Sequence, residues 1–232
     1  MNVFITADNI ISPLGNTSAA NFEQLSRETS GIKEHNRPEF SPVPFYAALF
    51  EPGADILPAD TINGYTKFEQ LLIASVKEAL HINPVDVESN RTGLIVSTTK
   101  GNISLLETNA GDPDLADRVA LHRSARVLAA HFGFRATPVI VSNACISGLL
   151  AILTGVRLIR SGQYDDVVVT GADVISKFVL SGFQSFQAVS DSVCKPFDAA
   201  RNGINLGEAA ATVILSRDKK NDTDIRVTGG SV

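Results

Sequence analysis

The chain has 232 residues, 44% hydrophobic and 19% charged, and carries a net charge of −5 at pH 7. This composition is ordinary for a globular protein, and the acidic balance without a basic run argues against a nucleic-acid or membrane-surface partner. The most apolar stretch, residues 148–159, contains Arg157 and is too short to span a bilayer, and no signal-peptide pattern opens the chain.

The first third of the chain predicts a strand, a short helix, an irregular excursion and a capped helix. These elements cover residues 3–11, 18–27, 31–63 and 66–80, in that order. Phe22 and Leu25 are expected to face inward from the short helix. Prolines recur through the excursion, which predicts short strands at most. Thr66 and Glu69 have the spacing of a capping box at the start of the last helix.

The rest of the chain predicts alternating strands and helices. Strands are expected at 92–98, 139–142, 167–172 and 209–216 with a short edge strand at 225–227, and helices at 112–132 and 146–161. The apolar runs at 139–142 and 167–172 lack polar alternation, which is typical of parallel strands covered on both faces. We therefore expect a single α/β domain over residues 1–232, with a five-stranded mixed sheet between helical layers.

Cys145 lies where a strand-like run passes through a tight turn into an amphipathic helix. A thiol at the first turn of a helix meets free backbone N–H groups and the positive end of the helix dipole, and both favour the reactive thiolate. A free cysteine can also serve as a small buried hydrophobe. The strand–turn–helix context favours a nucleophile, expected at the carboxyl end of a central strand.

The remaining chemistry-bearing residues give weaker signals. Cys145 and Cys194 make neither a disulfide framework nor a zinc pattern, which fits a reducing, cytoplasmic setting and predicts no metal site. Glu208 precedes an apolar strand and is either a general base or, more in keeping with its place, a buried structural carboxylate. His122 and His131 fall in a helical pattern, which favours a surface or helix-end role.

Four motifs in order resemble the β-ketoacyl-acyl-carrier-protein synthases, condensing enzymes of the thiolase superfamily. They are Asn143-Ala-Cys-Ile-Ser-Gly148, the opening segment 5–15 with Ser-Pro-Leu-Gly, the stretch 158–172, and Lys195-Pro-Phe-Asp198 with 201–210. The resemblance implies the N-terminal half of the thiolase-like fold. It also implies decarboxylative condensation of an acyl thioester with a malonyl thioester in fatty acid or polyketide-like biosynthesis, with Cys145 as the acyl-accepting nucleophile.

The same resemblance implies substrates carried as phosphopantetheine or coenzyme A thioesters, an acyl carrier protein as partner, and no cofactor. It makes Lys100, Phe183 and Gln187 candidate substrate-binding residues. Lys100 falls where relatives often place an apolar residue at the floor of the acyl pocket, although it could equally be an exposed loop lysine. Gln187 replaces an arginine that many relatives use near the pantetheine entrance.

Ketosynthases of this kind are about twice as long, and their catalytic histidines, lysine and Gly-Phe-Gly loop lie in the second half. His35, His81, His122 and His131 match none of those histidines. We therefore expect the chain alone to be inactive in condensation. It could be a gene fragment, a half-enzyme needing a second polypeptide, or a non-catalytic partner of the chain-length-factor kind; Cys145 weakens the last. We also expect a two-fold dimer through the apolar helix faces of 146–161 or 66–80.

Overall fold

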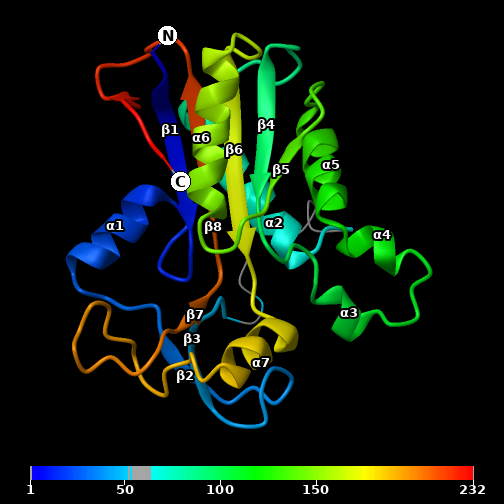
Figure 1. Cartoon of the computed structure of the whole chain (residues 1–232), viewed down its shortest axis with the longest axis vertical. Helices are drawn as coiled ribbons and strands as arrows, with labels where there is room; N and C mark the ends of the chain where they lie inside the picture. The colour runs from blue at the N-terminus through cyan, green and yellow to red at the C-terminus, as the bar shows by residue number, and fades with distance from the viewer. Residues whose placement is uncertain (1, 52, 54–63, 232) are drawn as a thin grey trace.

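A mixed β-sheet forms the centre of the molecule (Figure 1). The computed structural model describes residues 2–51, 53 and 64–231. The strands follow the order β5-β4-β6-β8-β1-β9. Their bounds are Phe4–Ile11 for β1, Thr92–Ser97 for β4, Val139–Val141 for β5, Asp166–Asp173 for β6, Ala209–Ser216 for β8 and Ile225–Arg226 for β9. The five predicted strands are confirmed, and β9 is the expected short edge strand.

The sheet changes direction between its two halves. Strands β5, β4 and β6 run parallel, whereas β8 is antiparallel to both β6 and β1. The chain leaves β4, adds β5 on one side, and then crosses β4 to add β6 on the other. Within the described residues β5 is therefore an edge strand, and the prediction that the nucleophile follows a central strand is wrong. Pairing order depends on crossovers, which a local pattern does not reveal.

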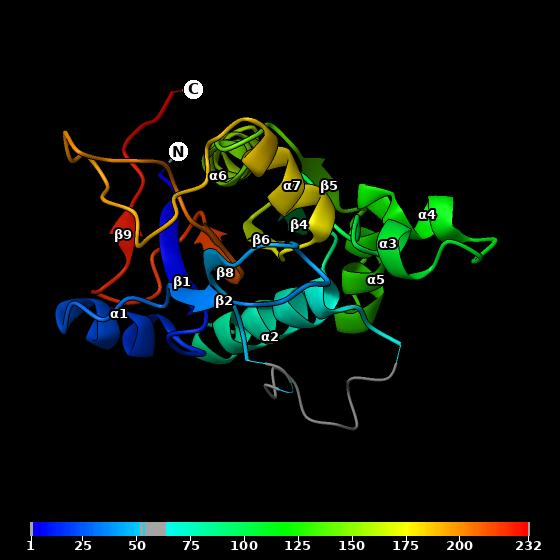
Figure 2. The same cartoon turned by 90° about the horizontal axis from the view of Figure 1, so that it is seen from below.

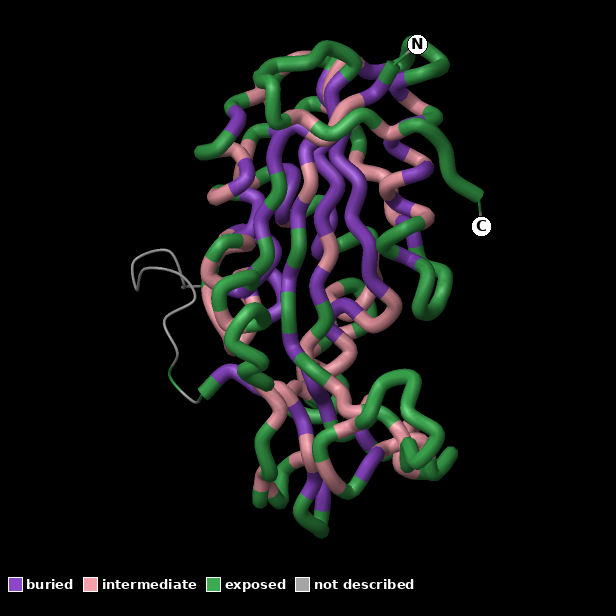
Figure 3. Tube along the Cα trace, turned by 90° about the vertical axis from the view of Figure 1, so that its left-hand side faces the viewer, coloured by how far each residue is buried: buried purple, intermediate pink, exposed green. Residues whose placement is uncertain are grey.

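Helices cover both faces of the sheet. Helices α2 (Lys67–Ile82) and α5 (Leu121–Phe132) lie on one face and α6 (Ser147–Arg160) lies on the other, as Figure 2 shows from below. Figure 3 shows the strands buried between them. Helix α6 packs closely because Gly155 faces the sheet: a Cβ there would lie 2.7 Å from Leu215 Cδ1. The predicted α/β architecture is thus confirmed.

The start of α2 has the predicted capping box. The Thr66 side chain accepts a hydrogen bond from the Glu69 N–H, and the Glu69 carboxylate accepts one from the Thr66 N–H. Both residues also contact Asn102, which is only 2% exposed: Thr66 Oγ1 donates to Asn102 Oδ1 over 2.6 Å, and Asn102 Nδ2 donates to Glu69 Oε1 over 2.9 Å. The cap therefore also holds the loop that follows β4.

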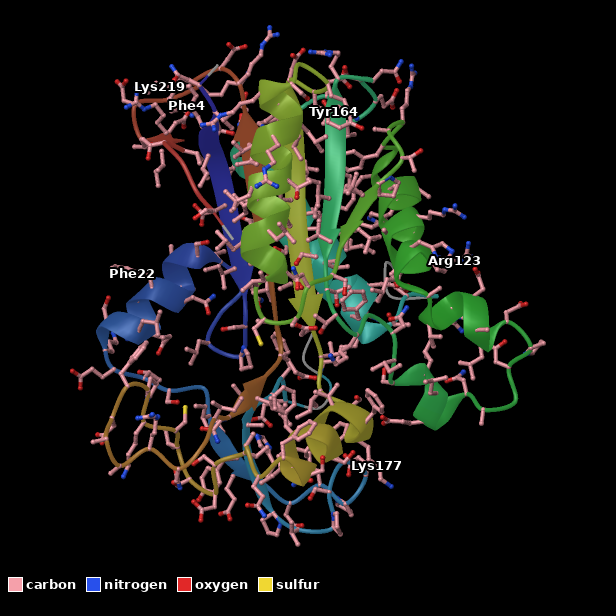
Figure 4. All side chains as sticks on the ribbon, viewed as in Figure 1. Phe4, Phe22, Arg123, Tyr164, Lys177 and Lys219 are labelled. Carbon is pink, nitrogen blue, oxygen red and sulfur yellow. The ribbon has the colours of Figure 1, made fainter. Side chains whose placement is uncertain are left out.

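The inward orientation predicted for α1 is wrong. Helix α1 (Ser18–Ser26) forms as expected, but Phe22 is 72% and Leu25 63% exposed, and Figure 4 shows Phe22 at the periphery. What attaches α1 is a polar residue. Asn21 is 5% exposed, and its amide donates hydrogen bonds to the carbonyls of Ile10, Gly15 and Thr17. Polar contacts of Asn21, rather than burial of Phe22 and Leu25, therefore attach this helix.

The helix predicted at 112–132 is divided in two. Helix α4 (Leu115–Val119) ends before Ala120, which has an extended backbone with φ −65° and ψ 129°, and α5 follows. The Arg118 carbonyl accepts a hydrogen bond from the Asn102 amide over 3.4 Å. The Asn102 side chain, from the loop after β4, thus donates a hydrogen bond to a carbonyl near the end of α4. A further short helix, α3 (Leu105–Thr108), was not predicted.

Part of the irregular excursion belongs to a second, smaller sheet with order β2-β3-β7. Its strands are Lys33–His35, Phe45–Ala48 and Leu206–Gly207, and helix α7 (Lys177–Ser185) packs beside them. Strand β7 and α7 were not predicted. Residues 52 and 54–63 of the excursion lie outside the described residues. In the part of the chain that the structure describes, no helix is long and apolar enough to cross a membrane.

Candidate active site

Three loops meet at one edge of the sheet because three parallel strands end there. Thr98 directly follows β4, Asn143 is the second residue after β5, and Asp173 is the last residue of β6. The crossovers leave β4 toward opposite sides, which opens a crevice at the carboxyl ends of the strands, where ligands of α/β sheets bind. Cys145 and Lys100 lie in these loops, so the topology brings together residues that are distant in sequence.

The turn between β5 and α6 presents Cys145 at the surface. Ala144 has a positive φ of 44°, which is uncommon for a residue with a side chain and stores strain at this point. Ser147 holds the turn, since its Oγ accepts a hydrogen bond from the Asn143 N–H and donates one to the Ala144 carbonyl, each over 2.7 Å. Cys145 is exposed between these fixed points.

The N-terminus of α6 follows directly after the cysteine. Ile146 occupies the cap position and makes no side-chain hydrogen bond, and the first turn contains no acidic residue. The positive end of this helix is therefore not neutralised by a residue of its own first turn. A carbonyl oxygen gaining negative charge beside Cys145 would meet this end of the helix.

Cys145 lies at the junction of two pockets. The larger has a volume of about 470 Å³ and extends over the ends of β6 and β8 toward Ile152 of α6. The smaller has a volume of about 270 Å³ and extends toward α7, where Val179 and Phe183 line it. Thr99 and Asp173 line both. The thiol can thus be reached from, and can place a bound group into, either pocket.

Lys100 and Asp173 are the charged residues of the smaller pocket. The Lys100 ammonium donates a hydrogen bond to Thr99 Oγ1 over 3.1 Å. Asp173 accepts one from Thr98 Oγ1 over 3.4 Å. Thr98 also accepts hydrogen bonds from the N–H groups of Lys100 and Gly101, so the same hydroxyl fixes the loop and contacts the carboxylate.

The pKa of the Asp173 carboxyl is raised above its ordinary value by burial, against the opposing effects of the Lys100 charge and the Thr98 hydrogen bond. Asp173 as a whole residue is exposed at the end of β6, while the protein packed around its carboxylate weakens the hydration of that group. Asp173 is the site residue that the sequence analysis missed. The signal was a carboxylate placed at the carboxyl end of a buried, apolar strand.

The structure brings together three of the four candidate site residues. Cys145, Lys100 and Phe183 line the smaller pocket. Gln187 does not line either pocket; it is exposed just beyond α7, with a positive φ of 54°. Cys194 is half-buried, and its N–H donates to Asn205 Oδ1 over 2.7 Å.

Glu208 is a structural carboxylate. It is 3% exposed, pairs with Lys67 over 2.6 Å, and accepts hydrogen bonds from the N–H groups of Phe50 and Ile175. It lines neither pocket. Its carboxylate oxygens are bound by one lysine and two backbone N–H groups, so the structural interpretation holds, with Lys67 as the charged partner.

All four histidines belong to the described residues, and none lines either pocket. The His131 ring lies 3.0 Å from the Tyr65 hydroxyl at the end of α5, and burial together with the Lys77 charge lowers its pKa. His122 lies beside Asp117 on the surface. The helix-end and surface roles predicted for these two are confirmed. Among the described residues, no three His, Cys, Asp or Glu side chains are grouped to hold a metal.

Known proteins resemble this chain over most of its length. The family model described as the β-ketoacyl synthase N-terminal domain matches residues 1–221. The chain belongs to the β-ketoacyl synthase family. It is 27% identical to 3-oxoacyl-[acyl-carrier-protein] synthase 2 of Vibrio cholerae, over 92% of this chain and 57% of that protein. It is 26% identical to the tetracenomycin polyketide synthase ketoacyl synthase alpha subunit of Streptomyces glaucescens, again over 92% and 57%.

Solved structures of β-ketoacyl synthases share the fold. The ishigamide ketosynthase/chain length factor superposes with a TM-score of 0.78 and 27% identity, over 93% of this chain and 58% of that one. A β-ketoacyl synthase from Burkholderia phymatum gives 0.76 at 21% identity. The predicted thiolase-like fold is therefore confirmed. The chain spans about half the length of the curated relatives it matches, from 46% to 58%.

The exposure of Cys145 predicts a difference between the two thiols. Cys145 should react several-fold faster with iodoacetamide than Cys194, because it is open to solvent beside an uncapped helix N-terminus while Cys194 is half-buried in a loop. Peptide mass spectrometry over a labelling time course measures both rates. Cys145→Ser and Cys194→Ser serve as matched controls, and equal rates would remove the argument for a nucleophile.

From the raised pKa of Asp173 we expect that replacing its carboxylate by a neutral amide stabilises the protein in a pH-dependent way. The folded protein keeps the proton on Asp173 to a higher pH than the unfolded chain does, because the pKa is raised in the folded state. The free energy of unfolding therefore falls as pH rises from the unfolded pKa through the folded pKa of this carboxyl. Relative to the unmodified protein, Asp173→Asn should therefore become more stable as pH rises from acid to neutral. Urea unfolding at several pH values measures this.

Asp165→Asn is the control of opposite sign. The hydrogen bond from Arg91, followed by the Arg217 charge, lowers the pKa of Asp165 despite its partial desolvation. The stabilisation from the ionised Asp165 is fully present above the pKa of the unfolded chain, and it disappears as pH falls through the lower pKa of the folded protein. Asp165→Asn should therefore lose stability near neutral pH and little in acid. A loss of stability at neutral pH in Asp173→Asn would contradict the assignment.

Proposed function

We propose that this protein carries the acyl-accepting half of β-ketoacyl-acyl-carrier-protein synthase chemistry. Its substrates would be acyl groups carried as phosphopantetheine or coenzyme A thioesters, and its partner an acyl carrier protein, in fatty acid or polyketide-like biosynthesis. The observation that carries the proposal is the position of Cys145: an exposed thiol on a strained turn, before an uncapped helix, at the junction of two pockets.

The first half-reaction follows from this arrangement. The Cys145 sulfur attacks the thioester carbonyl carbon, forming a new carbon–sulfur bond while the bond to the donor sulfur breaks. The donor leaves as a free thiol and takes up the proton that Cys145 gives up, so a thioester is exchanged for a thioester. The N–H groups at the start of α6 are suited to stabilise the oxyanion formed during attack. This step needs no cofactor.

The second half-reaction needs groups that these pockets do not contain. Decarboxylation of a malonyl thioester generates negative charge that a general acid or a pair of hydrogen-bond donors must stabilise. Lys100 is the only cationic side chain lining the pockets among the described residues, and no histidine lines them. We therefore propose that condensation depends on residues beyond this chain's own site, supplied by a second polypeptide segment.

A non-catalytic role as a chain-length-factor-like partner is the alternative. It draws support from the similarity to the solved ishigamide ketosynthase/chain length factor. An exposed thiol on a strained turn has no evident use in a protein that binds without forming an acyl-enzyme. Covalent acylation separates the two functions.

The test is acylation by acetyl-N-acetylcysteamine, followed by intact-protein and peptide mass spectrometry. We expect an acetyl group on Cys145, retained in Cys194→Ala and absent in Cys145→Ala. Adding malonyl-N-acetylcysteamine should yield no carbon–carbon bond. Without general acid–base partners, catalysis typically loses a factor of ~10²–10⁴. Acylation that is the same in Cys145→Ala as in the unmodified protein would favour the partner role. A condensation product that depends on Cys145 would contradict the proposal that this chain carries only the acyl-accepting half-reaction.

We also propose self-association through the start of α6. Ile146 is 42% and Leu149 51% exposed there. The apolar faces expected at the contact, in 66–80 and in 146–161, both cover the sheet: Leu71 of α2 and Ile159 of α6 are 0% exposed. Within these two ranges the large apolar side chains that stay exposed are those at the start of α6. Adjacent exposed apolar side chains are a common feature of interfaces between identical chains.

Light scattering coupled to size exclusion, at tens of micromolar protein, tests this. We expect a dimer that Leu149→Glu converts to a monomer. Phe22→Glu is the matched control, because Phe22 is 72% exposed on α1, away from the proposed contact, and its replacement should leave the dimer intact. A stable monomer of the unmodified protein would exclude the proposed contact.

A further inference from the structure

The smaller pocket beside Cys145 contains two charged side chains of opposite sign. Lys100 enters it from the loop after β4, and Asp173 from the end of β6. Val179 and Phe183 of α7 form its apolar side. At about 270 Å³ it is slightly below the ~300–1,000 Å³ typical of small-molecule sites. A group attached to the Cys145 sulfur that enters this pocket therefore shares it with both charges.

Lys100 has hydrogen-bonding capacity to spare. Its ammonium donates to Thr99 Oγ1, and none of the ion pairs among the described residues involves it. An ammonium has three donors, so at least one other donor direction remains for water or a ligand. The charges of Lys100 and Asp173 influence each other without closing into a contact pair. The pocket thus offers a donor and an acceptor that are both open to a ligand.

An alkyl chain and a polar chain would experience this pocket differently. A long alkyl chain would displace water from Lys100 and Asp173 and return no hydrogen bond, which is costly for charged groups. A chain ending in a hydroxyl can accept from the ammonium and donate to the carboxylate, so both groups stay satisfied. A ligand bearing its own full charge would be attracted by one residue and repelled by the other. A neutral hydrogen-bonding terminus fits the pair best.

We propose that Lys100 and Asp173 make this pocket select short acyl groups with a neutral hydrogen-bonding terminus over alkyl groups of equal length. The proposal rests on the acyl-accepting function proposed for Cys145, and it names the class of acyl group. Lys100 acts here as a specificity-determining residue, because it contacts the bound group rather than the reacting carbonyl. Phe183 contributes apolar surface to the near part of the chain.

The test measures pocket selectivity by a reaction that does not depend on acyl transfer. Pentyl and 4-hydroxybutyl methanethiosulfonate have chains of equal length and react with a thiolate to form a mixed disulfide. The Cys145 sulfur bonds to the alkylthio sulfur, and methanesulfinate leaves with the electron pair. The rate at Cys145 is followed by mass spectrometry in a Cys194→Ser background and divided by the rate with free cysteine.

We expect the 4-hydroxybutyl reagent to react faster by about tenfold in the unmodified pocket. Lys100→Met should bring the two rates to within about threefold, because the methionine presents apolar surface of similar length. Lys219→Met is the matched control and should leave the preference unchanged; Lys219 pairs with Asp222 and lies at the opposite end of the molecule from α7 (Figure 4). The methyl reagent carries no chain with which to probe the pocket, so its rate checks that Cys145 itself is unaltered.

Each outcome bears on a distinct claim. Equal rates for the two reagents in the unmodified protein, or a preference that survives Lys100→Met, would overturn the selectivity proposal. Failure of acetyl-N-acetylcysteamine to acylate Cys145 would instead overturn the proposed function. The same acylation assay with pentanoyl and 4-hydroxybutanoyl thioesters then shows whether the preference extends to acyl groups.

Discussion

The buried carboxylate of Glu208 is the interaction on which the arrangement of the molecule depends. It lies between β7 and β8, pairs with Lys67 at the start of α2, and accepts hydrogen bonds from the N–H groups of Phe50 and Ile175. Its own N–H donates to the carbonyl of Ala48 in the second sheet. A buried charge is costly unless fully paired, so these segments must assemble together.

This assembly positions both pockets. Ile175 follows β6 closely, and the chain from there leads into α7, which supplies one side of the smaller pocket. Gly207, next to Glu208, lines both pockets. The electrostatic requirement of one carboxylate thus fixes the second sheet and α7 against the carboxyl ends of the main strands. The site is built around a residue that takes no direct part in it.

The features that the sequence predicted correctly have local causes. The capping box at Thr66 and Glu69 needs only residues three apart. The five main strands and α6 follow from apolar runs and from glycine stops such as Gly162. The exposed turn at Cys145 follows from a strand, a turn and a helix in direct succession. In each case the determining contacts lie within one or two turns of chain, so the pattern alone contains them.

The features that were missed depend on side-chain contacts outside the regular pattern of the helix or strand concerned. The Asn21 amide binds carbonyls before and at the start of α1 while Phe22 stays exposed, and the helix at 112–132 is divided beside a carbonyl that the Asn102 amide binds. Asp173 was overlooked because its role depends on Lys100, in a loop of another strand. Pairing order made β5 an edge strand for the same reason. The pattern of a single sequence does not show which of these residues contact one another.

The loop carrying Lys100 is anchored on both sides of that residue. Thr98 holds the N–H groups of Lys100 and Gly101, and Asn102 is bound to the α2 cap. The Lys100 side chain itself contributes to none of these anchors. A single codon change at position 100 can therefore alter the chemistry of the pocket while the backbone stays in place. The side chain at this position can therefore vary without a compensating change in the contacts that hold the loop.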